Sequence, residues 1–448
     1  MMKLDLSRIL FLASCSAVIF LYGVATAKLE VFPYAIIVEA KNNVRDLYND
    51  RHALLYDDPI GFLQPARHEG NGVLVNKTGE QEANAIDDLV LLSSFYDQSN
   101  ELRLIQRDGT VVARWPVSYA QLFPDDGLKF RASRSDWNID IHGSLILPDG
   151  SIVFNFEYGG MAKLDRCGNL DWTVNQVTHH SVERADDGSF WSLGRHQHRA
   201  GSVSPFPPFE TPYSEDTIIN VSEEGDILLE LSVPKMLYDA GLEAVMTSTG
   251  GNMSQGEAWD NELVHTNKVT PLPAAIADDF LLFEAGDLAI SMRKLNLVIV
   301  VDPQDGKVKW WHTGPWLRQH DPEFKAGGTI VVFNNNAYFR PPSAETHSQI
   351  VEIDPVTNEA SVLYGNSTDQ KMLTIIRGKV DVNEGGRLLI TEFEAGRAFE
   401  VDKTGKVIWD YINRYDADRV AEITEARSYP SDYFTVSNWS CPSAAQLD

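Results

Sequence analysis

The sequence predicts an all-β fold, a six-bladed β-propeller with a short N-terminal helical segment. Three observations predict it: short apolar runs recur along most of the chain, glycine-containing turns separate them, and a tryptophan ends several of the repeated units. Glycine suits such turns because it adopts positive φ without steric cost. Repetition of short strands and tight turns is typical of propellers, in which each repeat forms one blade.

The predicted strands fall into two series. The first series mostly follows Asp-Gly, Gly-Gly or Gly-Asp turns and comprises Leu89 to Phe95, Ser151 to Phe156, Ser189 to Leu193, Leu288 to Met292, Thr329 to Phe333 and Arg387 to Phe393. The second series comprises Leu102 to Gln106, Met161 to Leu164, Thr217 to Val221, Leu297 to Val301, Ile350 to Ile353 and Ala398 to Val401. Apolar runs of this length between turn signals are typical of buried strands.

A final turn and strand complete the predicted unit. The tryptophans of these final strands are Trp115, Trp172, Trp310 and Trp409, each preceded by a glycine turn. The unit therefore has about four strands, as a propeller blade does, and we expect six units. A short run at Tyr433 to Val436 is expected to complete the first or the last blade. A pair of β-sandwiches is the alternative fold, and the recurring tryptophans disfavour it.

Residues 1–27 are predicted to be a signal peptide or a membrane anchor. Basic residues precede an uncharged apolar run from Ile9 to Ala27, and the run ends in Ala25-Thr26-Ala27, a pattern typical of a cleavage site. Because the run is about long enough to span a bilayer, an uncleaved anchor is the alternative. We expect the protein to be exported to a periplasm or secreted, or to be anchored in a membrane by this segment.

The remaining chain divides into two predicted parts. Residues 28–70 are expected to form an N-terminal helical segment, with an amphipathic helix over 36–55, and residues 71–448 the six-bladed propeller. The formal net charge of −26 disfavours nucleic acid as a partner. Cys167 and Cys441, the two cysteines beyond the leader, form either one disulfide or two free thiols.

Histidines recur at one position of the predicted repeat. They are His142, His180, His265 and His320, and each precedes a glycine-containing turn that leads into a β-rich segment. The inner strand of each blade lines the channel of a propeller, so we expect the four imidazoles to converge near its axis. A single histidine at such a place is usually structural, whereas four in register favour a functional site.

The strand after each turn carries a second set of polar residues. Seven residues after the turn glycines stand Glu157, Arg195, Arg293 and Asn335. Arginine and asparagine beside several imidazoles suit the binding of an oxyanion. His179 and His180 with His196 and His198 are the alternative candidates for a metal site, but no carboxylate or thiolate completes a recognisable spacing, and we predict no metal and no cofactor.

Several segments together resemble the arylsulfate sulfotransferases. They are Asp140-Ile141-His142 with Leu147-Pro148-Asp149-Gly150, then His265-Thr266-Asn267, Ser291-Met292-Arg293, Gln319-His320-Asp321 and Gly396 to Val401. The resemblance covers about residues 135–415 and is strongest from Trp310 to Asn336. It implies an exported six-bladed propeller that moves a sulfuryl group from an aryl sulfate to a phenol.

The resemblance also implies roles for individual residues. His320 matches the nucleophile that becomes a sulfohistidine, and His265 and Arg293 match the groups that bind the sulfuryl oxygens. His142 matches the remaining catalytic histidine, with His180 as its rival. The substrate-binding candidates are His180, Arg195, Asn335 and Asn267. Asp321 is expected either to orient His320 or to close a turn.

This sequence departs from the family pattern in its helical leader and in an insertion between His265 and Arg293 that runs through Pro271 to Asp279. Both are expected to reshape the acceptor pocket. Two other functions stay open at this point. One is a non-catalytic propeller that binds a ligand or a protein, and the other is a quinone-dependent dehydrogenase.

Overall fold

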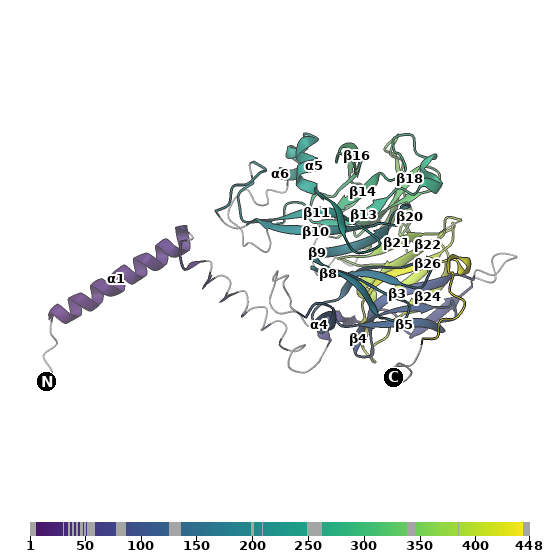
Figure 1. Cartoon of the computed structure of the whole chain (residues 1–448), viewed down its shortest axis with the longest axis horizontal. Coiled ribbons are helices and arrows are strands. Elements are labelled where there is room, and N and C mark those ends of the chain that lie inside the picture. Colours follow the sequence, from purple (N-terminus) through teal and green to yellow (C-terminus); the bar gives the residue numbers. More distant parts are fainter. Residues whose placement is uncertain are drawn as a thin grey trace.

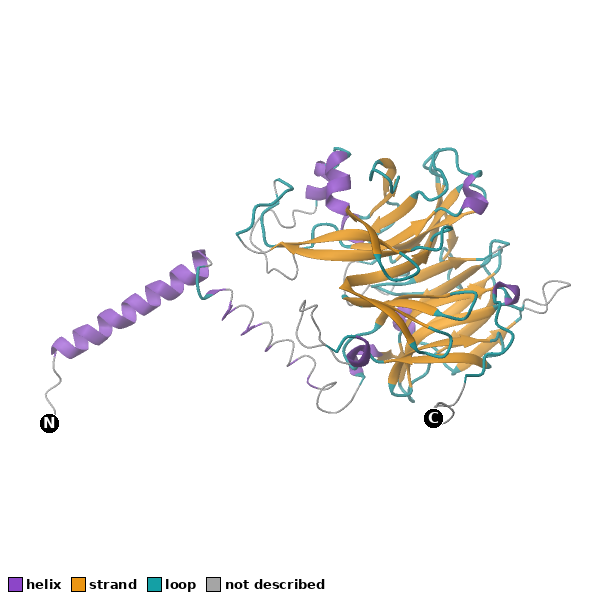
Figure 2. Ribbon diagram, in the orientation of Figure 1, coloured by secondary structure: helices purple, strands orange, loops and turns teal. Residues whose placement is uncertain are grey.

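The computed structural model is mostly β, with one long helix at the N-terminus (Figures 1 and 2). It describes residues 6–29, isolated positions between 31 and 51, and residues 59–77, 87–124, 136–198, 201–207, 209–248, 262–337, 346–383 and 385–441. The predicted helix over 36–55 lies largely outside the described residues.

Helix α1 (Leu6–Leu29) extends away from the β body (Figure 1). Its apolar side chains are exposed, and Ser7–Leu29 is long and apolar enough to cross a membrane by length and composition. Such a helix near the N-terminus is compatible with a signal peptide or an anchor, as the sequence predicts.

Four of the sheets form blades in a propeller-like arrangement, with the strands of each sheet running in antiparallel order. Three of them are four-stranded. The first contains β26 (Ile423–Tyr429), β3 (Leu89–Tyr96), β4 (Ser99–Ile105) and β5 (Val111–Val117), and the second contains β13 (Thr266–Pro271), β14 (Leu288–Met292), β15 (Leu297–Val301) and β16 (Val308–Thr313). The third contains β17 (His320–Lys325), β18 (Thr329–Asn334), β19 (Gln349–Ile353) and β20 (Ala360–Tyr364). The fourth is five-stranded: β21 (Lys379–Val382), β22 (Leu388–Glu392), β23 (Arg397–Val401), β24 (Val407–Ile412) and β2 (Gly72–Asn76).

A seven-stranded sheet contains β6 (Ile141–Ile146), β7 (Ile152–Phe156), β8 (Gly159–Leu164), β9 (Leu170–Arg184), β10 (Phe190–His198), β11 (Tyr213–Val221) and β12 (Ile227–Ser232). Strand β9 joins its two halves. The first part of β9, from Leu170, pairs with β8, and the last part, up to Arg184, pairs with β10. One long strand therefore serves as the outer strand of one four-stranded unit and the inner strand of the next.

The innermost strands of the sheets contact one another in a closed order. Strand β6 contacts β9, β9 contacts β13, β13 contacts β17, β17 contacts β21, β21 contacts β26, and β26 contacts β6. Apolar clusters fill the space between adjacent sheets, because strands such as Leu297–Val301 are apolar throughout and buried on both faces. The inner strands thus bring residues far apart in the sequence to one axis.

The two ends of the β body are joined within one sheet. Strand β26, near the C-terminus, is the inner strand beside β3, near the N-terminus. The predicted closing strand at Tyr433 to Val436 was wrong, because a short helix, η4 (Ser431–Tyr433), occupies its start and β26 precedes it. Strand β1 (Leu63–Pro65) pairs with β25 (Arg419–Ala421), so the β body begins before residue 71.

A disulfide fixes the C-terminal segment. Cys167 and Cys441 are bonded, with Cα atoms 5.6 Å apart and a separation of 274 positions in the sequence. Of the two alternatives from the sequence, the structure contains the disulfide. Disulfides persist in oxidising compartments, which agrees with the predicted export.

The predicted strands agree with the observed ones. Each run of both predicted series coincides with a strand, and the four tryptophans lie in β5, β9, β16 and β24. The turn glycines Gly150, Gly188 and Gly328 have φ of 83°, 90° and 83°, the left-handed conformation that glycine permits.

Short helices occur between the strands. They are α4 (Tyr119–Leu122), α5 (Val233–Asp239), α6 (Glu243–Thr247) and α7 (Ala274–Ala277), together with the 3-10 turns η1 (Ile60–Phe62), η2 (Arg293–Leu295) and η3 (Phe393–Ala395). Helix α7 lies within the insertion, which follows the end of β13, whereas His265 precedes its start. The insertion is therefore at the opposite end of the strand from His265, and its effect on the acceptor pocket stays a prediction.

Candidate active site

Four buried histidines on or directly before adjacent inner strands lie together. The rings of His142 and His180 are 4.0 Å apart between centroids, and the His180 ring is 5.4 Å from that of His265 and 6.3 Å from that of His320. The sequence led us to expect this convergence. His180, which the sequence left as a rival of His142, lies between the other three imidazoles.

Irregular backbone aims these side chains. The pairing register of β6, β9, β13 and β17 shifts close to the histidine of each strand. His180 and His265 have φ of 61° and 53°, and Asp321, beside His320, has 54°. A β-bulge redirects side chains and is over-represented near active sites. The bulges therefore turn the imidazoles toward one another, which a regular strand alternation would not do.

Asn335 fixes the protonation pattern of His320. The Asn335 side-chain nitrogen donates to the carbonyls of Thr374 and Arg377, at 3.0 and 2.7 Å, so its oxygen faces His320. That oxygen lies 2.7 Å from Nδ1 of His320, and because an amide oxygen only accepts, Nδ1 must carry the proton. Nε2 then holds a lone pair, and it is buried without a hydrogen-bond partner among the described residues.

His320 is held neutral. Burial lowers the pKa of His320 well below its usual value, and the positive charge of Arg293 lowers it further, although the hydrogen bond with Asn335 opposes this. A neutral imidazole with a free Nε2 lone pair is a nucleophile.

Arg293, at the start of η2, supplies positive charge to the site. Burial lowers the pKa of its guanidinium to about 10, with the nearby charge of Arg318 as the next cause. At neutral pH it is still protonated, and its guanidinium makes no hydrogen bond or ion pair with another described side chain. This charge is available to an anionic ligand. Arg318 was missed by the sequence reasoning, since it lies outside the repeated positions.

His265 is supported by a carboxylate. Its Nδ1 bonds the carboxylate of Glu262, whose other oxygen accepts from Arg195 at 2.6 Å. Arg195 also donates to Asp216 at 2.7 Å. Two carboxylates thus face Arg195, while its Nη2 is buried without a hydrogen-bond partner among the described residues, so substrate binding by Arg195 stays a prediction. Glu262 was missed because it falls in an irregular segment before β13.

His179 supports His180 in a similar way. Nε2 of His179 lies 3.3 Å from the carbonyl oxygen of Gly194, so we place a proton on this nitrogen. Nδ1 of His179 then accepts from Nδ1 of His180, at 2.6 Å. Nε2 of His180 is left unprotonated. The sequence had offered His179 only as a metal-ligand alternative.

The two remaining predicted residues, His142 and Asn267, differ in their hydrogen bonding. His142 has no hydrogen-bond partner on either ring nitrogen within the described chain, and burial followed by the charge of Arg377 lowers its pKa well below the usual value. The Asn267 side chain donates to the carbonyl of Gln319 at 2.7 Å and thereby holds the residue before His320. Asn267 therefore positions β17, although its side-chain oxygen has no partner there.

Asp321 does not orient His320. Its carboxylate lies 2.8 Å from Nζ of Lys268 and accepts from the backbone of Val380 at 2.7 Å. Lys268 also contacts Glu183 and Glu323, each at 2.6 Å. These four residues form an ionic cluster next to the histidines, on β9, β13 and β17.

The carboxyl groups of the ionic cluster are not all ionised at neutral pH. Burial raises the pKa of Glu323 to about 8, an effect that Lys268 opposes and Asp321 reinforces. Burial acts on Glu183 too, but Arg427 and Lys268 outweigh it and lower its pKa to about 2. Glu323 is thus protonated, while Glu183 is ionised.

The effect of replacing Glu323 with glutamine on stability, followed as a function of pH, tests whether Glu323 is protonated at neutral pH. A carboxyl whose pKa is raised from 4.5 to about 8 contributes stability that is present in acid and is lost as the pH rises through this interval. The free energy of unfolding of the wild type minus that of Glu323→Gln should therefore fall by up to about 1.4 kcal/mol per pH unit between about 4.5 and 8. Urea denaturation at several pH values measures it, and a difference independent of pH would refute the assignment.

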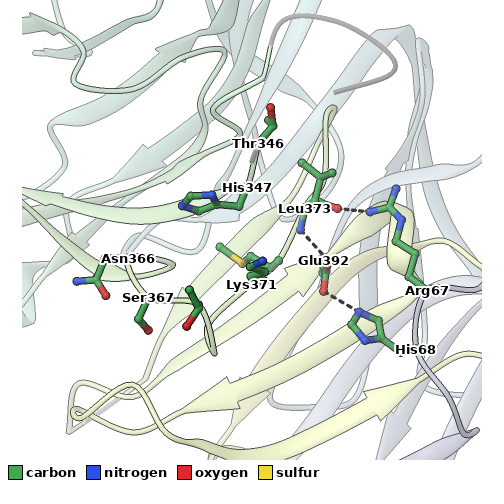
Figure 3. Close-up of a pocket in the computed structure, with 11 residues that line it drawn as sticks. Arg67, His68, Thr346, His347, Asn366, Ser367, Lys371, Leu373 and Glu392 are labelled. Carbon is green, nitrogen blue, oxygen red and sulfur yellow. Dashed lines mark hydrogen bonds and ion pairs between the residues drawn. The ribbon is translucent and has the colours of Figure 1, made fainter. Parts of the chain in front are cut away.

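A separate pocket of about 440 Å³ adjoins the segment that holds Asn335 (Figure 3). Arg67 donates to the carbonyl of Leu373, and His68 lies 3.5 Å from Glu392, which accepts from the amide of Leu373 (Figure 3). The next residue, Thr374, accepts the hydrogen bond from Asn335. The wall of this pocket is therefore continuous with the support of His320.

Two histidines of the metal alternative have partners of their own. His196 lies 2.8 Å from Glu230, and His198 bonds Glu215, so each has a carboxylate partner of its own. Within the described part of the chain, no group of three or more histidines, cysteines or carboxylates could hold a metal ion.

The fold and the site together define a class of protein: a propeller-like β scaffold in which neutral imidazoles and a guanidinium surround one place, an arrangement suited to an anionic substrate. The chain belongs to the arylsulfotransferase family, because the model of the family described as arylsulfotransferase (ASST) matches residues 142–414, more than half of the sequence. The match contains all eight predicted site residues and supports arylsulfotransferase activity at the level of the family.

Comparison with curated proteins finds no match. Solved structures with similar folds include a protein of unknown function from Bacteroides caccae, at 12% identity with a TM-score of 0.47, which covers 76% of this chain and 98% of its own. A streptogramin B lyase is 11% identical with a TM-score of 0.41 and covers 78% of this chain and 87% of its own. Similarity at this level assigns no function to the chain.

Proposed function

We propose that this protein is an aryl sulfotransferase that moves a sulfuryl group from an aryl sulfate to a phenol through a sulfohistidine at His320. The observation that carries the proposal is the neutral His320 imidazole, whose Nδ1 proton is held by Asn335 at 2.7 Å and whose Nε2 is free, close to the positive charge of Arg293. The family match supports the reaction class.

The first half-reaction forms the covalent intermediate. Nε2 of His320 attacks the sulfur of the donor, the S–O bond to the aryl group breaks, and the aryl oxide leaves. Negative charge on the sulfuryl oxygens is stabilised by the guanidinium of Arg293, while His142 and His180 complete the polar wall. The covalent step splits one difficult transfer into two easier ones.

The second half-reaction returns the enzyme to its starting state. The oxygen of the acceptor phenol attacks the sulfur, and the N–S bond of sulfohistidine breaks. The proton that the phenol loses balances the one that the departed aryl oxide takes up. The aryl sulfate itself supplies the sulfuryl group, so the proposed ping-pong reaction needs no nucleotide donor and no other cofactor.

Further observations support a six-bladed architecture and export of the protein. We count six blades, with the seven-stranded sheet as two blades joined by β9, because the closed order of inner strands then contains one strand from each blade. The propeller domain corresponds to the predicted 71–448 with β1 added. Export, with α1 as the signal or the anchor, is supported by α1 and by the disulfide.

Intact-mass measurement after incubation with 4-nitrophenyl sulfate and no acceptor tests the proposal. We expect the protein to gain one sulfuryl group, located on His320 by peptide mapping, and to lose it when a phenol is added. If a folded protein gains no mass with this donor, or carries the group elsewhere, the proposed mechanism is wrong. A ligand-binding propeller would then be favoured.

A further inference from the structure

The Glu262–His265 pair differs from the other histidines of the site. Glu262 stands three residues before His265, and its carboxylate bonds Nδ1 of the imidazole. Nε2 of His265 is buried with no hydrogen-bond partner in the described structure. A carboxylate on one nitrogen and a free second nitrogen is the arrangement of an acid–base histidine, since the carboxylate fixes the tautomer and stabilises the imidazolium.

The surroundings keep Glu262 ionised. Its second oxygen accepts from Arg195 at 2.6 Å and from the hydroxyl of Tyr158 at 3.4 Å. Burial acts to raise the pKa of Glu262, but the charges of His265 and Arg195 outweigh it and hold that pKa well below the usual value. The carboxylate is therefore available as a permanent negative partner of His265.

The other three imidazoles of the site are protonated less readily than His265. Nδ1 of His320 bonds an amide oxygen, Nδ1 of His180 bonds another imidazole, and His142 has no partner within the described residues. Burial lowers the pKa of each of these three well below the usual value. Burial and Arg293 lower the pKa of His265 too, but Glu262 opposes them. A bound sulfate ester would add negative charge and favour the imidazolium further.

We infer that His265 carries the proton of the reaction and that Glu262 is the residue that positions it. This inference rests on the proposed function and replaces the binding of sulfuryl oxygens as the main role of His265. In the first half-reaction, Nε2–H of His265 protonates the aryl oxygen as the S–O bond breaks. In the second, Nε2 takes the proton of the acceptor phenol as its oxygen attacks the sulfur and the N–S bond breaks. The protons balance over the cycle.

The test compares leaving groups in Glu262→Gln. A nitrophenoxide is stable enough to leave without a proton, whereas the oxide of unsubstituted phenol is a poorer leaving group. We expect the rate of His320 sulfurylation by 4-nitrophenyl sulfate to change less than about threefold and that by phenyl sulfate to fall about a hundredfold, the usual range of general acid catalysis. Glu230→Gln, which removes the carboxylate beside the exposed His196, is the matched control and should leave both rates unchanged.

A second variant separates chemistry from folding. His265→Gln keeps an amide donor but cannot transfer a proton, and it should show the same selective loss with phenyl sulfate. Equal losses with both donors in the folded variants would overturn the inference, as would no loss with either. Failure of the wild type to form sulfohistidine with 4-nitrophenyl sulfate would instead overturn the proposed function, so the two failures are distinguishable.

Discussion

Replacing His320 with alanine should lower the turnover of 4-nitrophenyl sulfate with a phenol by about a thousandfold or more, because no nucleophile then remains in the site. The effect should be on the maximal rate, since Arg293 and the other imidazoles still surround the substrate. Release of nitrophenolate, followed by its absorbance, measures it. A His320→Ala protein that keeps its thermal stability and more than about a tenth of the activity would contradict the assignment.

His196→Ala is the matched control for this experiment. His196 is half-exposed, lies 2.8 Å from Glu230, and is outside the histidine cluster, so its loss should leave turnover unchanged.

In the wild type, the rate of sulfurylation by 4-nitrophenyl sulfate should stay constant as the pH falls from about 8 to about 6.5, since burial and Arg293 keep the pKa of His320 well below 6.5.

The strands could be predicted from the sequence because their signals are local. A run such as Leu297 to Val301 is apolar throughout, and turn glycines such as Gly150 and Gly188 have the positive φ that the turns require. Repetition then placed one histidine at the same position in several units. Convergence of His142, His180, His265 and His320 followed from this repetition.

The partners of the histidines could not be predicted, because irregular backbone decides them. Strand alternation would place His179 and His180 on opposite faces, yet the bulge in β9 and the left-handed φ of His180 bring their Nδ1 atoms to 2.6 Å. Glu262 reaches His265 from a segment without periodic pattern. Arg195 was expected to bind substrate because of its position in the repeat, whereas its ion pairs with Asp216 and Glu262 depend on the packing of adjacent strands.

Three residues of the ionic cluster recur in the sequence at the same spacing as the site histidines. Glu183, Lys268 and Glu323 each follow a site histidine by three residues, on β9, β13 and β17. The same geometry that brings three imidazoles together therefore brings these charged side chains together beside them. The cluster connects the three inner strands through Lys268, and Arg427 on β26 extends it by its contact of 2.5 Å with Glu183.

Replacing Lys268 with methionine should lower the free energy of unfolding by about 3–5 kcal/mol, because removal of one partner leaves buried negative charge without compensation. The Lys268 side chain is 2% exposed, and its ammonium lies within 2.8 Å of Glu183, Asp321 and Glu323. Methionine fills the space of the side-chain stem and therefore isolates the loss of charge from the loss of packing.

Urea denaturation measures this loss, with Lys235→Met as the control. Lys235 forms an exposed ion pair with Asp239, and its replacement should cost less than about 1 kcal/mol. A loss below about 1 kcal/mol for Lys268→Met would contradict the role of the cluster. Because the cluster lies between the strands that carry His180, His265 and His320, the variant should also lose sulfuryl transfer under conditions in which it is still folded. The ionic cluster then contributes to activity as well as to stability, because it fixes the spacing of the inner strands and this spacing positions the imidazoles.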